Sequence, residues 1–270
     1  MSEGAPIDIS VIIPAKNEAK RLPLFLQALL PYCHKSAKNY EIIVVDDGSM
    51  DKTSEVVHRF QEQFSTLGLL RLKKNRGKGY AVRAGFRAAE GAVVLFIDAD
   101  GSTPPEEIED HFKDLEAGAD IVIGSRVLKD DTHETQTLVY RRFIGMVFNT
   151  LVHLFLIPDI ADTQCGFKMF RREAVGPVFS RLQTDGFGFD LEVLYVAEKL
   201  GFKIKEVPIN WHHVAASKTN LFLDPLKMFG DIFRIRRRHR DLRPGQGGES
   251  WGEMARAEGS EGVKWLRRKS

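Results

Sequence analysis

The chain has 270 residues, 43% of them hydrophobic, enough to bury the core of one large domain or two small ones. Its formal charge of only +2 gives no reason to expect a general affinity for nucleic acid. Cys33 and Cys165 exclude a disulfide framework and a zinc-type spacing, and suit a reducing compartment. We expect neither a signal peptide nor a transmembrane helix, because the longest apolar stretch, 143–157, is shorter than the about 20 residues that a spanning helix needs.

The first half of the chain alternates short apolar segments with helical patterns. Strands are predicted at 8–14, 41–46, 68–72, 92–98 and 119–124. Helices are predicted between them, at 22–32, 51–65, 78–90 and 104–117. Continuously apolar strands separated by helices indicate an α/β fold, with a mostly parallel sheet covered on both faces.

The second half has a less regular pattern. Its predicted elements are a helix at 138–157, a short strand at 166–170, helices at 171–182 and 189–200, a strand at 203–210 and a helix at 222–240. We therefore expect an ordered domain over residues 1–240 and a mobile polar tail over 241–270. Within this tail, the segment VKWLRR has the composition of a short docking helix.

Polar and charged residues follow four of the predicted strands. They are Asn17 and Glu18, Asp46 and Asp47, Asp98 and Asp100, and Arg126. In parallel sheets, ligands bind beyond the carboxyl ends of the strands. The sequence therefore predicts one binding crevice at this edge of the sheet.

The segment DADGST, residues 98–103, carries the strongest chemical signal. Asp98 and Asp100 are two residues apart at a strand end, so their like charges need a metal ion, a shared proton or water. An EF-hand is excluded because Thr103 occupies the position that requires glycine. A haloacid-dehalogenase-like phosphatase with Asp98 as nucleophile stays open, as does a plain helix-capping turn. A nucleotide-diphosphate site fits best, because Mg²⁺ or Mn²⁺ is held by one or two carboxylates together with substrate phosphates.

Two glycine-containing loops lie near the same edge. In VVDDGSMDKTSE the turn and helix cap are structural, and Asp47 is the candidate for binding a base or ribose. In NRGKGYAVRAG the glycines fit neither a dinucleotide fingerprint nor a Walker motif. Gly77 and Gly79 would nevertheless let the backbone and the Lys78 ammonium approach a diphosphate.

A polar stripe interrupts the apolar helix predicted at 138–157. Arg141, Gly145, Asn149 and His153 recur every four residues and so share one helix face. This stripe is either a solvated surface or a face on which Arg141 binds a phosphate. Arg126, in the motif GSR, is the natural second cation for that phosphate.

Six motifs, in this order, resemble those of family 2 glycosyltransferases with the GT-A fold: SVIIPAKNE, VVDDGSMD, NRGKGYAVRAG, DADGST, GSR and DTQCGFKMF. The resemblance covers residues 8–236. The segments YRRFIGMVFNTLVHLF, FDLEVLYVAEKLG and VPINWHHVAASK are most similar to dolichyl-phosphate β-glucosyltransferases, with dolichyl-phosphate mannose synthases as neighbours. The resemblance implies a Rossmann-like sheet, a nucleotide-binding half over about 7–126, an acceptor-binding half over about 127–240, and C-terminal interfacial helices.

The resemblance also implies roles for individual residues. The nucleotide-sugar pocket would comprise Pro14, Lys16, Glu18, Val45, Asp47, Lys78, Asp98, Ala99, Asp100, Ser217 and Lys218. Asp98, Asp100 and Ser102 would be the metal ligands, Ser102 standing where mannose synthases carry a glutamine. Arg126 and Arg141 would hold the acceptor phosphate, and Gly145 replaces a serine of related enzymes.

The implied reaction is the inverting transfer of a hexose, glucose from UDP-glucose first, onto polyprenyl or dolichyl phosphate. The nucleophile would be the acceptor phosphate, whose second pKa near 6 makes a general base unnecessary. Asp190 would then orient groups rather than accept a proton. The alternatives are a GDP-mannose-dependent mannosyltransferase, the phosphatase, and a silent nucleotide- or lipid-binding module.

A polyprenyl phosphate stays in the bilayer, so the enzyme must reach it. In the segment 222–240, Leu226, Phe229 and Phe233 have helical spacing and RIRRRHR follows, a pattern typical of an interfacial helix. We expect a cytoplasmic protein that binds peripherally to the cytoplasmic face of a membrane.

Overall fold

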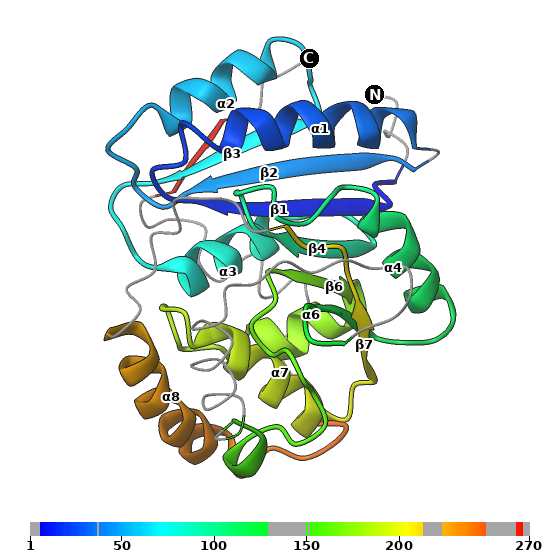
Figure 1. Cartoon of the computed structure of the whole chain (residues 1–270), viewed down its shortest axis with the longest axis vertical. Helices are drawn as coiled ribbons and strands as arrows, with labels where there is room; N and C mark the ends of the chain where they lie inside the picture. The colour runs from blue at the N-terminus through cyan, green and yellow to red at the C-terminus, as the bar shows by residue number, and fades with distance from the viewer. Residues whose placement is uncertain are drawn as a thin grey trace.

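The computed structural model of the chain describes residues 6–36, 38–128, 150, 152–212, 223–246 and 263–266. Its centre is one sheet with the strand order β7-β5-β6-β4-β1-β2-β3-β8 (Figure 1). The strands are β1 (Ile9–Ala15), β2 (Tyr40–Asp46), β3 (Leu67–Leu72), β4 (Val93–Ile97), β5 (Ile121–Ser125), β6 (Phe167–Arg171), β7 (Ile204–Pro208) and β8 (Val263–Leu266).

The sheet is mostly parallel, as the sequence predicts. β1 pairs in parallel with β2 and β4, β2 with β3, and β5 with β7. Two strands run the other way: β6 is antiparallel to β4 and β5, and β8 is antiparallel to β3. The ends of β1, β2, β4 and β5 therefore lie along one edge of the sheet, where parallel folds bind ligands.

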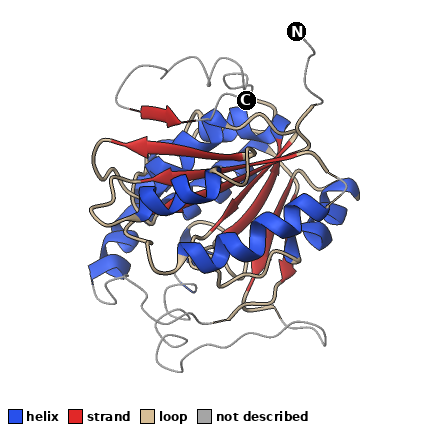
Figure 2. Ribbon diagram, turned by 90° about the horizontal axis from the view of Figure 1, so that it is seen from above, coloured by secondary structure: helices blue, strands red, loops and turns tan. Residues whose placement is uncertain are grey.

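Helices cover both faces of the sheet (Figure 2). They are α1 (Leu22–Lys35), α2 (Thr53–Gln61), α3 (Lys78–Ala88), α4 (Glu107–Glu116), α6 (Arg172–Phe179), α7 (Phe189–Leu200) and α8 (Leu223–His239). Along β1, Ile12 belongs to one hydrophobic core while Val11 and Ile13 belong to the other, because alternate strand residues point to opposite faces. Helices α3, α6, α7 and α8 pack on the face of Ile12, and α1, α2 and α4 pack on the opposite face.

The C-terminal segment differs from the sequence prediction. Residues 263–266 of VKWLRR form β8, not a helix, and pair with Leu69–Leu72 of β3. A strand at this place satisfies backbone groups that β3 would otherwise expose at the sheet edge, and valine and tryptophan favour strands. The beginning of the predicted tail is also packed, since Leu242 contacts the core and the Gly245 amide donates to the Leu200 carbonyl at 3.2 Å.

The helix predicted at 138–157 is described only in part. Residue 150 and residues 152–155 are helical, and Arg141, Gly145 and Asn149 lie outside the described residues. His153 lies in the described part of this helix, and its Nε2 is 2.7 Å from the Ile160 carbonyl oxygen. His153 therefore has a local structural partner.

Candidate active site

Asp98 and Asp100 lie in the turn after β4, which ends at Ile97, so both carboxylates belong to the turn and not to the strand. Asp98 Oδ1 is 2.7 Å from Lys78 Nζ, and Asp100 Oδ2 is 3.7 Å from Arg21 Nη1. The side chains of Asp98 and Asp100 remain 38% and 28% exposed. Each carboxylate thus has a cation of its own and still faces solvent. Arg21 was not singled out from the sequence, although it lies three residues after Glu18.

A glycine allows the Asp98 carboxylate to lie where it does. The Asp98 amide donates to the Gly166 carbonyl at 3.0 Å, which holds the turn against the start of β6. A Cβ atom on Gly166 would overlap the Asp98 carboxylate. The glycine of DTQCGFKMF therefore contributes to the site through the space it leaves, a role that its place in the motif did not show.

The loop before α3 places Lys78 at the start of that helix. Gly77 has φ +100°, a conformation that strongly favours glycine, and Gly79 donates its amide to the Asp185 carbonyl at 2.8 Å. Asp47 accepts hydrogen bonds from the amides of Arg76 at 2.6 Å and Gly77 at 2.9 Å. Burial raises the pKa of Asp47, and these two amides offset part of that rise. Asp47 thus stabilises the loop before α3 that carries Lys78. The predicted contact of Asp47 with a base or ribose stays a prediction.

The residues after β1 surround the same turn. Lys16 Nζ donates to the Asp47 carbonyl at 3.0 Å, and the carboxylate of Glu18 accepts from Arg21 Nε at 2.7 Å. Asn17 has φ +55°, which asparagine tolerates, and its amide donates to Ser49 Oγ at 2.9 Å. These bonds connect the end of β1 to the turn after β2.

Several residues predicted for the pocket or the metal lie in strands or in the turn after β4, and most of their side chains are buried. Pro14 pairs with Val45 across β1 and β2, and the Val45 side chain is fully buried in the core. Ala99 is buried within the turn, and Ser102 is buried with its amide donating to Asp100 Oδ1 at 3.0 Å. The role of Ser102 as a metal ligand stays a prediction. Asp46, the last residue of β2, accepts a hydrogen bond from the Ser49 amide and so stabilises the turn after that strand.

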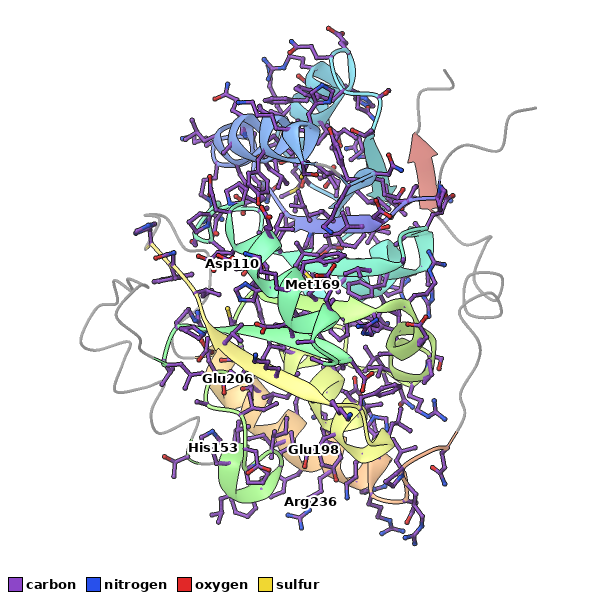
Figure 3. All side chains as sticks on the ribbon, turned by 90° about the vertical axis from the view of Figure 1, so that its right-hand side faces the viewer. Asp110, His153, Met169, Glu198, Glu206 and Arg236 are labelled. Carbon is purple, nitrogen blue, oxygen red and sulfur yellow. The ribbon has the colours of Figure 1, made fainter. Side chains whose placement is uncertain are left out.

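Arg126 is held by a partner that sequence reasoning missed. Asp162 accepts from Arg126 Nε at 2.7 Å, from Nη2 at 2.8 Å and from the Arg126 amide at 3.0 Å. The Asp162 amide donates to Glu206 of β7, a residue that Figure 3 labels, at 2.7 Å. Burial alone would raise the pKa of Asp162, but the guanidinium lowers it overall. Asp162 is the first residue of the motif DTQCGFKMF, and its place in that motif was the signal by which the sequence could have identified it.

Asp190 lies in the first turn of α7 and pairs with a buried lysine. Lys168 Nζ is 2.5 Å from Asp190 Oδ1, and both side chains are almost completely buried. Burial raises the pKa of Asp190, and the ammonium groups of Lys168 and Lys78 offset only part of the rise. Lys168 was also missed, although a lysine inside the apolar strand GFKMF is unusual. Ser217 and Lys218, like Arg141, lie outside the described residues.

The family follows from a sequence comparison. The profile of Glycosyl transferase family 2 matches residues 10–179, well over half of the chain. The chain belongs to glycosyltransferase family 2. The predicted family is thereby confirmed, and the alternative of a haloacid-dehalogenase-like phosphatase is excluded.

Curated relatives of this glycosyltransferase share most of its length. A dolichyl-phosphate beta-glucosyltransferase of Dictyostelium discoideum is 39% identical over 87% of this chain and 76% of its own length. The human protein of that name is 37% identical over 86% of this chain and 75% of its own length. The Saccharomyces cerevisiae protein of that name is 36% identical over 85% of this chain and 74% of its own length.

Solved structures confirm the predicted GT-A fold. Glucosyl-3-phosphoglycerate synthase from Mycobacterium tuberculosis, solved with Mn²⁺ and UDP-glucose, superposes with a TM-score of 0.64 at 20% identity. The match covers 89% of this chain and 81% of that one. The same enzyme solved with UDP gives a TM-score of 0.61, and the match covers 89% of this chain and 82% of that one. At this level of identity the likeness shows the fold alone.

Proposed function

We propose that this glycosyltransferase transfers glucose from UDP-glucose to dolichyl phosphate or another polyprenyl phosphate, with inversion at the sugar carbon. The observation that carries the proposal is the match to dolichyl-phosphate beta-glucosyltransferases at 36–39% identity over 85–87% of the chain. The choice of UDP-glucose is supported by the structural neighbour that was solved with this donor and Mn²⁺. Transfer of mannose from GDP-mannose is the alternative that the first experiment tests.

The turn after β4 fits a divalent metal in its chemistry. In the parts of the chain that the structure describes, no cluster of three or more His, Cys, Asp or Glu side chains is positioned to hold a metal alone. Asp98 and Asp100 are hard oxygen ligands that remain partly exposed, and Mg²⁺ or Mn²⁺ sites commonly combine one or two carboxylates with substrate phosphates. Asp98 and Asp100 would hold the ion, which when bound supplies positive charge to the leaving diphosphate.

The chain's own cations supply the remaining electrostatics. Lys78, at the start of α3, would contact the donor diphosphate, and the amides at a helix N-terminus also favour anions. Arg126, fixed by Asp162, and Arg141 would bind the acceptor phosphate. One acceptor oxygen forms a bond to the sugar carbon as the bond to the UDP oxygen breaks, and UDP leaves with that electron pair. No proton has to be removed, because the acceptor phosphate is largely ionised at neutral pH.

The donor and the acceptor are tested in one assay. Purified protein with Mn²⁺ and dolichyl phosphate is given radiolabelled UDP-glucose, GDP-mannose or UDP-N-acetylglucosamine in turn. We expect label in the lipid fraction with UDP-glucose alone. Label from GDP-mannose alone would favour the mannosyltransferase instead.

We further propose peripheral binding to the cytoplasmic face of a membrane. Within the described helices, none is both long and apolar enough to cross a bilayer. Leu154, which precedes Phe155 in the chain, is 70% exposed, and Phe233 and Phe229 of α8 are 46% and 38% exposed. The ring centroids of Phe155 and Phe229 lie 5.5 and 5.3 Å from that of Phe233, so the rings form one surface, which we call the α8 patch.

Basic side chains border the α8 patch. Arg236 donates from Nη1 to the Phe155 carbonyl at 3.3 Å, and Arg237 is exposed beside it. Arg236 and His153 lie at the same end of the molecule (Figure 3). Exposed aromatic rings bordered by arginines match the surface of an anionic bilayer. The proposed cytoplasmic side is supported by Cys33 and Cys165, which are both buried free thiols.

A further inference from the structure

Lys168 stands in the centre of the sheet, in strand β6. In register it lies between Phe96 of β4 and Ile123 of β5, and its side chain is 1% exposed. Its Nζ donates to the Cys165 carbonyl at 2.7 Å and to Asp190 Oδ1 at 2.5 Å. A buried ion pair is weak evidence for stability, because apolar residues of similar volume often stabilise a fold as well or better. The fold alone therefore does not explain this lysine.

The Lys168–Asp190 pair is continuous with the proposed donor site. Asp190 interacts electrostatically with Lys78, whose Nζ is 2.7 Å from Asp98 Oδ1. The order Lys168, Asp190, Lys78, Asp98 thus alternates positive and negative charge from the interior to the turn after β4. The Lys78 ammonium thus lies beside the turn at which a diphosphate would bind.

Aromatic rings lie near the Lys78 ammonium. Its ammonium lies 5.0 Å from the ring centroid of Phe96 and 6.0 Å from that of Phe189. Lys168 Nζ lies 5.9 Å from the same Phe96 ring. The two lysines thus share the Phe96 ring, and a change at one alters the surroundings of the other.

We propose that Lys168 is a positioning residue for donor binding: it anchors the Asp190 carboxylate, and Asp190 orients the Lys78 ammonium toward the donor diphosphate. This inference rests on the proposed function, in which Lys78 contacts the diphosphate of UDP-glucose. It assigns Lys168 and Asp190 to the binding of the donor and not of the acceptor. The expected kinetic signature is a higher donor KM with an unchanged acceptor KM.

A double-variant comparison separates positioning from stability. Lys168→Met, Asp190→Asn and the double variant are compared with wild type by thermal unfolding and by calorimetric titration with UDP. Lys168→Met should lower Tm, because it leaves a carboxylate buried without its cation, and the double variant should recover most of that loss. UDP affinity should fall about tenfold in Lys168→Met, because Asp190 has lost its anchor. It should stay low in the double variant, because the residue that replaces Asp190 has no negative charge with which to orient Lys78.

Two further variants complete the design. Lys168→Arg keeps the charge and should bind UDP within about threefold of wild type. Lys113→Met removes an exposed lysine that pairs with Asp110 on α4, and should leave UDP affinity unchanged. Wild-type affinity for UDP in the double variant, or in folded Lys168→Met, would overturn the inference and leave the proposed function intact. If the wild type binds GDP in place of UDP, only the proposed donor is wrong, and the same comparison is made with GDP.

Discussion

Replacing Phe229 and Phe233 by serine should detach the protein from anionic vesicles without weakening nucleotide binding. The two rings expose 38% and 46% of their surface. An aromatic side chain carries roughly 200 Å² of burial, so each exposed part is worth about 2 kcal/mol at about 25 cal/mol per Å² when a bilayer covers it. Shallow insertion realises part of this sum, so the double variant should bind vesicles about 30- to 1000-fold more weakly.

The assay is flotation with phosphatidylcholine vesicles that contain phosphatidylserine, at low and high salt. Leu24→Ser is the matched control, because Leu24 is 70% exposed but lies on α1, at the opposite end of the molecule from α8 (Figure 1). This control should float like wild type, and all proteins should bind UDP equally. Transfer to vesicle-borne acceptor should fall with flotation. Unchanged flotation of the double variant, or an equal loss in the control, would refute the assignment of the α8 patch.

The remaining predictions concern the active site and an ion pair near it. Asp100→Asn should abolish most transfer without lowering Tm, because the side chain is partly exposed and serves the metal; full activity in excess chelator would contradict this. Gly166→Ala should reduce transfer more than tenfold, since its Cβ would displace the Asp98 carboxylate, and wild-type kinetics would show that the turn adapts. The pKa of Asp162 is lowered in the fold, so its stabilising effect is present above about pH 3.9 and is lost as the pH falls. Asp162→Asn should therefore lower Tm at pH 7 and flatten its decline between about pH 5 and 2, whereas curves parallel to wild type would contradict the pairing.

The basic block that follows the α8 patch is less uniform than the sequence indicates. Arg236, Arg237 and Arg238 are all exposed, but Arg238 also lies 3.7 Å from the buried Glu192. The Glu192 carboxylate also accepts from the Thr184 amide at 2.7 Å, and so ties α7 to the loop beside Lys78. A charge reversal intended to test membrane binding should therefore change Arg236 and Arg237 and keep Arg238.

The sequence by itself determined the elements and the turn that bears Asp98 and Asp100. Each described strand from β1 to β7 lies within a few residues of its predicted position, because continuous apolar runs and helical periodicity are local properties of the chain. The order of the motifs identified the family. The charged residues at the strand ends located the site, because parallel strands place their carboxyl ends along one edge of the sheet.

Only the tertiary structure decided which charged groups meet. Lys168 and Asp190 are 22 residues apart, and Arg126 and Asp162 are 36 apart. The antiparallel direction of β6 and the strand β8 likewise depend on neighbours distant in sequence. The periodicity of a sequence predicts whether a residue is buried. The partner that stabilises a buried charge depends on packing between residues distant in sequence. The role of Lys168 in its apolar strand therefore could not be inferred until the structure showed that it pairs with Asp190.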